Sequence, residues 1–335
     1  MPIHPGGSLC WSEPEDIGYR LRIADCEFWS AALLRRFFHD AFPQQMKILI
    51  VGAGGRLGAA LLRGYQGEHD IAGFNRAQLD LSNLDQIRQK LSGTDFDVLI
   101  NAAAFTNVDL CETQPEQAFC INAEAPRVLA KICGDKGAKL IHFSTDYVFD
   151  GKKRAPYTED DEANPISVYG ESKLAGEKNV LAAQNRHLVV RVSWVFGPDR
   201  PSFIDGMIKR AQENETVDAI ADKFSTPTYT HDIAEMLPQF FDGDVEDGIL
   251  HFANAGKCSW QEYSQWALDC CIESGVPVKV RTVGALSLKD MKDWIARRPV
   301  YSVLSTAKYA QLTGTPPRTW REAVADYIRR FYSKK

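Results

Sequence analysis

The chain has 335 residues, of which 44% are hydrophobic and 25% charged, and its formal net charge is -5 at pH 7. This length is enough for one large buried core and a smaller lobe. The acidic balance provides no basic surface of the kind that nucleic acids need, and no apolar run reaches the length of a membrane span. Eight cysteines show neither a C-x-x-C pair nor a zinc-ligand spacing, so we expect reduced thiols, a cytoplasmic protein and no tightly held metal.

The N-terminal segment, residues 1–45, stands apart from the rest. It lacks the apolar region and the small-residue cleavage site of a signal peptide. Residues 26–42 (CEFWSAALLRRFFHDAF) predict an amphipathic helix with one apolar side formed by Phe28, Leu33, Phe37 and Phe38. Three interpretations stay open: a docking or dimerisation helix, a helix on a membrane surface, or an extension introduced by gene prediction before a true start at Met46.

From Met46 onward, strand-like and helix-like segments alternate, which predicts an α/β fold with a Rossmann-type, doubly wound parallel sheet. The apolar run KILIVG leads into the turn GAGGRLG, and leucines then recur at helical spacing. Glycines allow such a turn to approach a dinucleotide diphosphate, which rests on the helix N-terminus. The predicted cofactor contacts in the turn are Gly52, Gly54, Gly55, Arg56, Leu57 and Gly58.

The second predicted strand, residues 69–74, ends at Asn75-Arg76. In dinucleotide folds an acidic residue at this position binds the ribose hydroxyl of NAD, whereas an arginine accommodates the phosphate of NADP. No acid stands here, so we predict NADPH bound through Arg76, with Arg56 as a helper and NADH as the alternative cofactor. The competing interpretation is that either arginine is simply solvated.

The next two elements carry further candidate residues. Asp80 and Leu81 precede a short helix, for which Ser82 is the predicted N-cap. The third predicted strand, 97–101, runs into Ala102, Ala103 and Ala104, whose small side chains let a cofactor pass close to the backbone. A helix predicted over 116–133 contains Asn122, which in the structural interpretation is a buried, locally satisfied polar group.

The stretch from residue 139 to 173 predicts the reaction chemistry. A buried strand over 139–143 ends in Ser144 and Thr145, and a helix farther on carries Tyr169 and Lys173. At i and i+4 their side chains share one helix face, so we expect the ammonium to lower the phenol pKa from its usual value of about 10. Tyr169 would then be the general acid for a carbonyl that Thr145 also contacts, while a nicotinamide delivers hydride. A surface Tyr/Lys pair is the ordinary explanation of an isolated match; the preceding strand and glycine turn favour the catalytic one.

After a further strand, predicted over 187–193 and followed by Trp194, the alternation loosens. We therefore predict a cofactor domain over 46–197 and a smaller C-terminal lobe over 198–335 that binds substrate and is partly interleaved with the first domain. Within this lobe the expected helices cover 203–212, 260–273 and a segment beginning near Thr230, and the expected extended segments cover 215–221 and 248–253.

The segments GAGGRLG, DVLINAAAFTNVDLCE, FSTDYVFDG, PISVYGESKLAGE, RVSWVFG and ARRPVYSVLST resemble the dTDP-4-dehydrorhamnose reductase family of the extended short-chain dehydrogenase/reductase superfamily, over Met46 to about Phe331. The resemblance implies NADPH-dependent reduction of the 4-keto group of a dTDP-6-deoxy-4-keto-hexose, with Thr145, Tyr169 and Lys173 catalytic. It also implies cofactor contacts at Asp80, Leu81, Ala102, Ala103 and Ala104, and substrate contacts at Thr106, Asp146, Tyr147 and Trp194. Arg297 and Arg298 are expected either to bind the substrate diphosphate or to pin the lobe through carboxylates.

The resemblance also bears on which reaction the protein catalyses. Dehydratases of the superfamily need a glutamate where Tyr147 stands, and epimerases usually have smaller residues there, so simple reduction is favoured. A non-catalytic NADP-binding subunit, like the beta subunit of methionine adenosyltransferase, and a reductase of another nucleotide sugar remain open. Besides the nucleotide-sugar substrate, a second copy of the chain is a possible partner, in a homodimer. Some members of the family also hold a divalent ion between surface glutamates, but this sequence does not show such a site.

Overall fold

The structure is a computed structural model that describes residues 45–183, 186–242 and 247–333. Residues 45–335 form one compact unit. The amphipathic helix predicted over 26–42 lies outside the described residues. Among the described helices, none is both long and apolar enough to cross a membrane.

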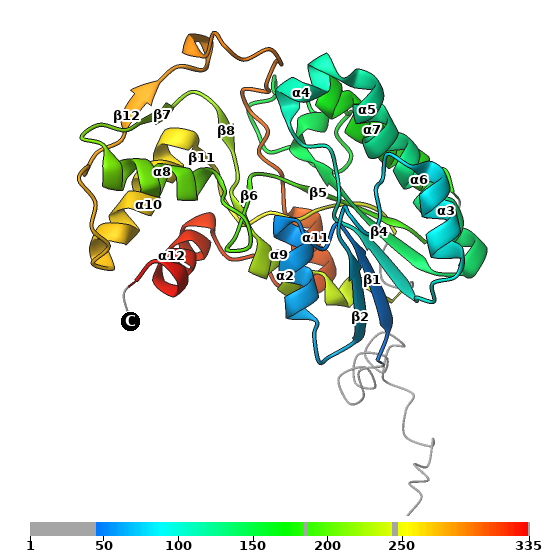
Figure 1. Cartoon of the computed structure of the whole chain (residues 1–335). Coiled ribbons are helices and arrows are strands. Elements are labelled where there is room, and N and C mark those ends of the chain that lie inside the picture. Colours follow the sequence, from blue (N-terminus) through cyan, green and yellow to red (C-terminus); the bar gives the residue numbers. More distant parts are fainter. Residues whose placement is uncertain (1–44, 184–185, 243–246, 334–335) are drawn as a thin grey trace, which may run out of the picture. The chain divides into compact units, whose positions relative to one another are not determined.

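A parallel sheet of six strands organises the described chain (Figure 1). Its order is β2-β1-β3-β4-β5-β10. The strands are β1 (Lys47–Val51), β2 (Asp70–Phe74), β3 (Val98–Asn101), β4 (Lys139–Thr145), β5 (Leu188–Val192) and β10 (Gly248–His251). Since the chain winds outward from β1 in both directions, the crevice beyond β1 and β3 is the point where such sheets bind ligands. The predicted α/β, doubly wound sheet is confirmed.

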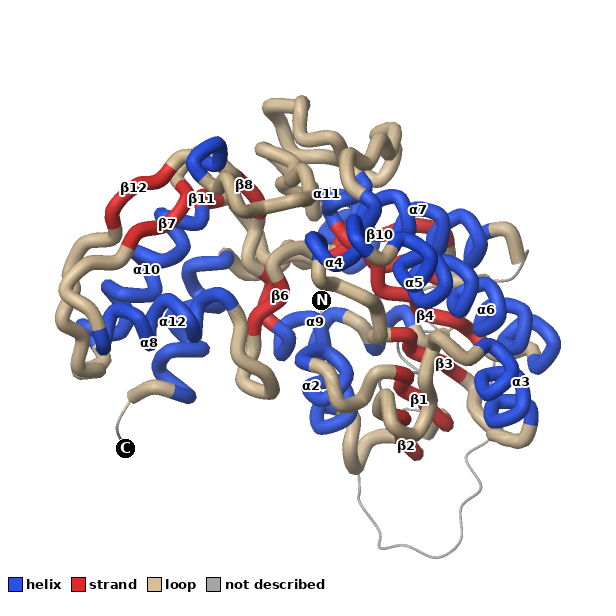
Figure 2. Tube along the Cα trace, turned by 45° about the horizontal axis from the view of Figure 1, so that its top comes forward, coloured by secondary structure: helices blue, strands red, loops and turns tan. Residues whose placement is uncertain are grey.

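Helices cover both faces of this sheet (Figure 2). On one face lie α2 (Arg56–Gly64), α9 (Thr230–Met236) and α11 (Ala307–Thr313), and on the other lie α3 (Leu84–Ser92), α6 (Ala125–Lys136) and α7 (Val168–Leu181). Along β1, Ile48 and Ile50 enter the first core, whereas Leu49 and Val51 enter the second. Both faces of β1 are therefore buried, which explains its continuous apolar sequence.

Two helix boundaries differ from those expected. Asn83, not Ser82, caps α3, because its side chain accepts the Gln86 amide while Ser82 turns back to the Asp80 carboxylate. The helix predicted over 116–133 is divided into α5 (Pro115–Phe119), a π-helical turn η2 (Cys120–Glu124) and α6, after the short helix α4 (Val108–Thr113). Single π turns often occur at functional sites, and this one carries Asn122.

A second group of elements builds its own core beside the sheet. Its helices are α8 (Phe203–Glu213), α10 (Trp260–Glu273) and α12 (Trp320–Phe331), and buried side chains from all three meet in one cluster. Its two-stranded pairings are β6 (Val195–Phe196) with β9 (Thr228–Tyr229), β7 (Asp218–Ile220) with β12 (Gly284–Leu286), and β8 (Phe224–Ser225) with β11 (Cys258–Ser259). The intervening α9, β10 and α11 return to the parallel sheet, so the C-terminal half of the chain contributes to both cores.

Candidate active site

One cavity of about 950 Å³ opens at the carboxyl ends of the parallel strands. Its wall includes residues from the turn after β1, the ends of β3 and β4, helix α7 and the segment 192–203. We call the part formed by residues 52–57 and 75–81 the glycine end, and the part formed by Trp194, Phe203, Trp260 and Tyr263 the aromatic end. This volume lies at the upper end of the range of about 300–1,000 Å³ that is usual for ligand-binding pockets.

The glycine end is built by very close backbone packing. Gly52 has a positive φ of 88°, and a Cβ there would lie 2.8 Å from the backbone nitrogen of Ala103. A Cβ on Gly58 would lie 2.2 Å from the carbonyl oxygen of Gly52, so Gly58 lets α2 approach the turn and does not itself line the cavity. Gly55 caps α2 without any side-chain hydrogen bond. The first N–H groups of α2 thus face the cavity, next to glycine residues whose backbone is not covered by side chains. This arrangement fits the diphosphate of a dinucleotide.

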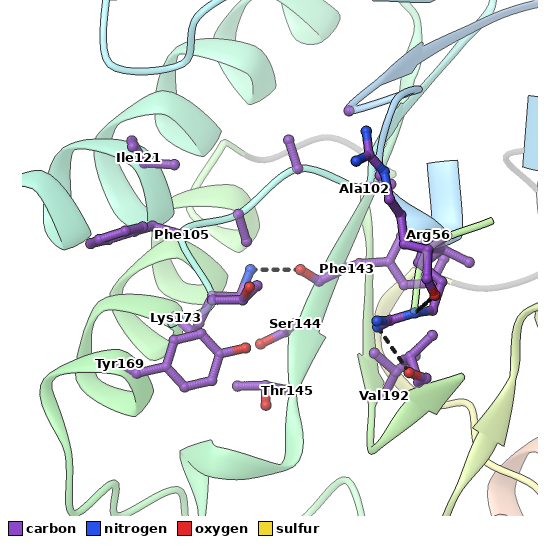
Figure 3. Close-up of a pocket in the computed structure, with 18 of the residues that line it drawn as sticks. Arg56, Ala102, Phe105, Ile121, Phe143, Ser144, Thr145, Tyr169, Lys173 and Val192 are labelled. Carbon is purple, nitrogen blue, oxygen red and sulfur yellow. Dashed lines mark hydrogen bonds between the residues drawn. The ribbon is translucent and has the colours of Figure 1, made fainter. Parts of the chain in front are cut away.

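The two arginines expected near the ribose lie in different settings. Arg76 stands at the cavity rim with 76% of its side chain exposed, and its Nε lies 4.0 Å from Asp80. Arg56 instead donates hydrogen bonds to the carbonyl oxygens of Val195, Arg200 and Pro201, at 3.1, 3.1 and 2.5 Å. Figure 3 shows Arg56 at the cavity wall. Its guanidinium therefore ties the glycine-rich turn to the second group of elements.

The remaining candidates at this end also line the cavity. Hydrogen bonds from the backbone and the hydroxyl of Ser82 hold the pKa of Asp80 below its usual value. Leu81 is buried beside it. Ala102, Ala103 and Ala104 form the wall beyond β3. The next residue, Phe105, is fixed by Asn122, whose side chain accepts its N–H at 2.8 Å and donates to its carbonyl at 3.0 Å.

The three candidate catalytic residues come together in the middle of the cavity (Figure 3). Thr145 ends β4, while Tyr169 and Lys173 project from α7. The Lys173 ammonium donates a hydrogen bond of 2.7 Å to the Phe143 carbonyl, and its Nζ lies 3.4 Å from His142 Nε2. Burial lowers the pKa of Lys173 to about 8, and the charge of Glu177 opposes this shift.

The phenol of Tyr169 differs from the expectation in the direction of its pKa. Burial raises that pKa well above its usual value, and a hydrogen bond with Thr145 only partly opposes the shift. The expected lowering by Lys173 is therefore wrong for this structure, because desolvation dominates and the ammonium is directed to the Phe143 carbonyl. The phenol stays protonated at neutral pH, which is the form that a proton donor requires.

Asp146 and Tyr147 both line the cavity, but the Asp146 carboxylate is already surrounded. It accepts hydrogen bonds from the hydroxyls of Thr145 (3.2 Å), Ser193 (3.2 Å), Ser225 (3.0 Å) and Ser302 (2.5 Å). Burial raises its pKa. Asp146 thus joins the end of β4 to three later segments of the chain, and Tyr147 packs edge-on against Tyr169 with ring centroids 5.6 Å apart.

A buried ion pair between Glu177 and Arg191 stabilises the end of β4. Glu177 lies one helical turn beyond Lys173 on α7 and accepts hydrogen bonds from Arg191 at 2.9 and 2.7 Å. It also accepts a hydrogen bond of 2.5 Å from Ser144. These contacts fix α7 against β4 and β5, so the spacing between Tyr169 and Thr145 is held by rigid elements.

The aromatic end contains one predicted residue and several that the sequence did not indicate. Trp194 has φ 39°, the only positive φ of a described non-glycine residue, and its ring centroid lies 5.6 Å from that of Trp260. Phe203, Trp260 and Tyr263 occupy helices in which an aromatic residue is an ordinary core residue, so no sequence pattern distinguished them. Thr106 lies in the wall of the cavity, exposed.

Arg297 and Arg298 do not line the cavity. Arg298 donates to both carboxylate oxygens of Asp109 in α4, at 3.2 and 2.7 Å, and stacks on Trp294. Asp109 also accepts the backbone N–H groups of Ile295 and Ala296. Arg298 was expected either to bind the substrate diphosphate or to pin the lobe through a carboxylate, and in the structure it pairs with a carboxylate. Arg297 is exposed.

The described residues contain no group of three or more His, Cys, Asp or Glu side chains placed to hold a metal ion. The cysteines of the described part, which are Cys111, Cys120, Cys133, Cys258, Cys270 and Cys271, are all free thiols.

Comparison with known proteins agrees with this geometry. Residues 46–333 match the family described as the RmlD substrate binding domain. The chain is 41% identical to a dTDP-4-dehydrorhamnose reductase of Mycolicibacterium smegmatis, over 88% of each chain. It is 36% identical to a probable dTDP-4,6-dihydroxy-2-methyloxan-3-one 4-ketoreductase of Streptomyces antibioticus, over 84% of this chain and 94% of that protein.

A solved structure extends the likeness to the fold and the cofactor. The dTDP-4-dehydrorhamnose reductase of Bacillus anthracis, crystallised with NADP, superposes with a TM-score of 0.79 at 32% identity, covering 86% of this chain and all of that one. The match therefore includes the parallel sheet and the second group of elements alike. The chain belongs to the RmlD substrate binding domain family, and it is an NAD(P)H-dependent oxidoreductase.

Proposed function

We propose that the protein reduces the 4-keto group of a dTDP-6-deoxy-4-keto-hexose with NADPH, converting dTDP-4-dehydro-L-rhamnose to dTDP-L-rhamnose. The observation that supports this most strongly is the meeting of Thr145, Tyr169 and Lys173 in the same cavity as the glycine-rich turn. The relatives named dTDP-4-dehydrorhamnose reductase, and the NADP in the Bacillus anthracis structure, support the substrate and the cofactor.

The cofactor would lie along the glycine end. Its diphosphate would face the N-terminus of α2, Arg76 would bind the ribose phosphate, and Ala102, Ala103 and Ala104 would allow close approach of the ribose. When bound, the nicotinamide supplies the hydride. Lys173 would bind the nicotinamide ribose, so this lysine would position the cofactor as well as carry a positive charge beside Tyr169.

The protein residues would handle the proton and the carbonyl oxygen. Tyr169 would donate its phenolic proton to that oxygen as negative charge develops, and the hydroxyl of Thr145 would polarise the same carbonyl. The deprotonated phenol would be stabilised by the ammonium of Lys173. Thr145, Tyr169 and Lys173 all come from β4 or α7, which the Glu177 contacts hold together, so little reorganisation would precede the proton transfer.

The sugar nucleotide would occupy the aromatic end, with Trp194 and Tyr147 against the sugar and Thr106 at the rim. Tyr147 packs against Tyr169, and this bulky side chain beside the proposed proton donor supports reduction over epimerisation. We further propose a cytoplasmic enzyme, supported by the free thiols, and a homodimer, supported by the exposed apolar side chains of Leu110 and Phe119 on the neighbouring helices α4 and α5.

The test is NADPH oxidation with dTDP-4-dehydro-L-rhamnose generated in situ, followed by the loss of NADPH absorbance, with NADH as the comparison. Turnover with NADPH, and dTDP-L-rhamnose as the product, is the expected result. Tight NADPH binding without turnover of this substrate or of other nucleotide sugars would contradict the proposal. It would favour a binding subunit, which co-purification with a methionine adenosyltransferase would then identify.

A further inference from the structure

Lys223 is a buried cation without a hydrogen-bond partner. It lies between β7 and β8 with none of its surface exposed, and its Nζ makes no hydrogen bond within the described part of the chain. A buried ammonium costs free energy unless it is paired and hydrogen-bonded. Because an apolar side chain of similar volume would avoid this cost, the charge of Lys223 needs an explanation besides packing.

Three aromatic rings surround this ammonium. Its Nζ lies 5.3 Å from the ring centroid of Tyr147, 5.2 Å from that of Trp194 and 5.8 Å from that of Trp260. All three distances fall within the reach of cation-π attraction, which is about 6 Å. The same three residues line the cavity, whereas Lys223 does not. The positive charge therefore sits directly behind the wall of the aromatic end.

The charged neighbours act on Lys223 through space and make no hydrogen bond with it. Asp146 attracts the ammonium and Arg298 repels it, while burial lowers the pKa of Lys223 to about 8. The Asp146 carboxylate is already engaged by four hydroxyl groups and forms no ion pair with Lys223. Next to the ammonium, Trp194 holds its strained φ of 39°, and its indole N–H is also buried without a partner. Strain and unsatisfied polar groups of this kind concentrate where a ligand binds.

The cationic side chains that do line the cavity already interact with other groups or lie at the glycine end. Arg56 donates to three backbone carbonyls, and Arg200 donates to the Gly54 carbonyl of the glycine-rich turn at 3.0 Å. Arg76 stands at the glycine end, and Lys173 donates to Phe143. A nucleoside diphosphate sugar carries two negative charges, and of the four cations that line the cavity three are engaged by backbone carbonyls and the fourth stands at the glycine end.

We propose that Lys223 supplies the positive charge by which the aromatic end recognises the diphosphate of the substrate. This inference rests on the proposed function, because it assigns a charge partner to the nucleotide sugar. A buried charge is screened less by water than an exposed one, so it acts more strongly on an anion held against the aromatic wall. The aromatic cage also holds the long side chain in place, so the charge is oriented before the substrate arrives.

The test compares ligand affinities by calorimetry in three variants. Lys223→Met removes the charge at similar volume, Lys223→Arg keeps it, and Lys257→Met is the control. Lys257 is an exposed lysine beside β11 whose ammonium lies over the rings of Phe224 and Tyr301, neither of which lines the cavity. The probes are dTDP, thymidine and NADPH, so that the substrate diphosphate, the nucleoside alone and the cofactor diphosphate are measured separately.

We expect Lys223→Met to weaken dTDP binding by about tenfold or more, with thymidine and NADPH affinities within about twofold of wild type. Lys223→Arg should retain more dTDP affinity than the methionine variant, and Lys257→Met should change none of the three. The melting temperature of each variant is measured alongside, so that a loss of dTDP affinity is compared at a known stability of the fold.

Other outcomes would overturn the inference in recognisable ways. Equal losses of dTDP and thymidine affinity together with a lower melting temperature would show that Lys223 only packs the aromatic wall. Unchanged dTDP affinity in Lys223→Met, with wild-type turnover, would remove Lys223 from recognition and leave the proposed function intact. A wild-type protein that does not bind dTDP at all would overturn both proposals.

Discussion

The ammonium of Lys173 and the carbonyl oxygen of Phe143 are 2.7 Å apart, so a buried charge on α7 is anchored to the last apolar residue before the polar end of β4. Burial nevertheless lowers the pKa of Lys173 from 10.5 to about 8. The lysine therefore changes charge within a pH range in which the phenol of Tyr169, whose pKa is raised, keeps its proton.

The first prediction concerns pH. The value of kcat should fall as the pH rises through about 8, because Lys173 loses the charge that stabilises the reacting phenol. The sign for stability is opposite: between about 8 and 10.5 the unfolded lysine binds more protons than the folded one, so the contribution of Lys173 to the unfolding free energy should rise with pH in that window. Buried cysteines such as Cys133, whose thiol pKa is raised, contribute with the opposite sign, so the lysine's effect is read from the difference between wild type and a Lys173 variant. Rate profiles and denaturant titrations measure the two effects. The difference in unfolding free energy between wild type and Lys173→Met should therefore shift in favour of wild type as the pH rises from about 8 to 10.5. A kcat independent of pH across this range in wild type would contradict the assignment.

The second prediction concerns the proton donor. Tyr169→Phe should lower kcat by about 10²- to 10⁴-fold, the usual contribution of a positioned general acid. NADPH affinity should stay unchanged, since the aromatic ring and its packing against Tyr147 are retained. Steady-state rates and cofactor titration measure both quantities. A variant with nearly normal turnover would show that another group donates the proton.

The third prediction concerns cofactor choice. Arg76→Ala should weaken NADPH binding by about tenfold or more and leave NADH nearly unaffected, because a charge-assisted contact to the ribose phosphate is lost. Arg88→Ala is the matched control, since Arg88 is also an exposed arginine near an aspartate but does not line the cavity. Fluorescence titration with both cofactors provides the comparison. Equal losses for NADPH and NADH would exclude Arg76 as the phosphate ligand.

The fourth prediction concerns packing beneath the glycine-rich turn. Gly58→Ala places a methyl group 2.2 Å from a backbone oxygen that cannot easily move, so it should destabilise the fold by about 1–3 kcal/mol and weaken NADPH binding. Gly206 lies within α8, and nothing stands within 4 Å of an added Cβ there. Gly206→Ala should therefore stabilise by about 0.5–1 kcal/mol. Thermal and denaturant unfolding distinguish these opposite signs, and a stabilised Gly58→Ala variant would contradict the packing.

The fifth prediction concerns the Asp109 clamp. Asp109→Asn should lower the unfolding free energy by about 1–3 kcal/mol, because the largely buried Arg298 guanidinium loses its carboxylate. Asp85→Asn breaks an exposed ion pair with Arg88 and should change stability by less than about 0.5 kcal/mol. Urea denaturation of both variants measures the difference. Equal effects would mean that the clamp contributes no more than a surface pair.

Local spacing in the sequence was enough to predict the central strands, the glycine-rich turn and the shared face of Tyr169 and Lys173. These features depend on neighbouring residues, and the structure contains them all. The comparisons confirmed the family and the cofactor expected from them. The roles assigned to individual site residues remain predictions, because proximity in a cavity does not measure chemistry.

Contacts between distant segments were not predictable in the same way. Arg298 meets an aspartate 189 residues earlier, and Arg56 meets carbonyls 139 to 145 residues later. Lys223 occurs in the sequence as a single lysine with no motif around it, and only its burial behind three rings distinguishes it. The raised pKa of Tyr169 likewise follows from its burial by the whole fold, and burial cannot be predicted from the helical spacing of Tyr169 and Lys173 alone.

The hydrogen bonds of Asp146 have a consequence for how the protein matures on the ribosome. Its hydroxyl partners Ser193, Ser225 and Ser302 are 47, 79 and 156 residues farther along the chain. The carboxylate therefore lacks its full set of hydrogen bonds until residue 302 has left the ribosome. A chain truncated before residue 302 would thus lack one of the four hydroxyl groups that surround this carboxylate at the end of β4, and reductase activity would appear only after that residue has been made.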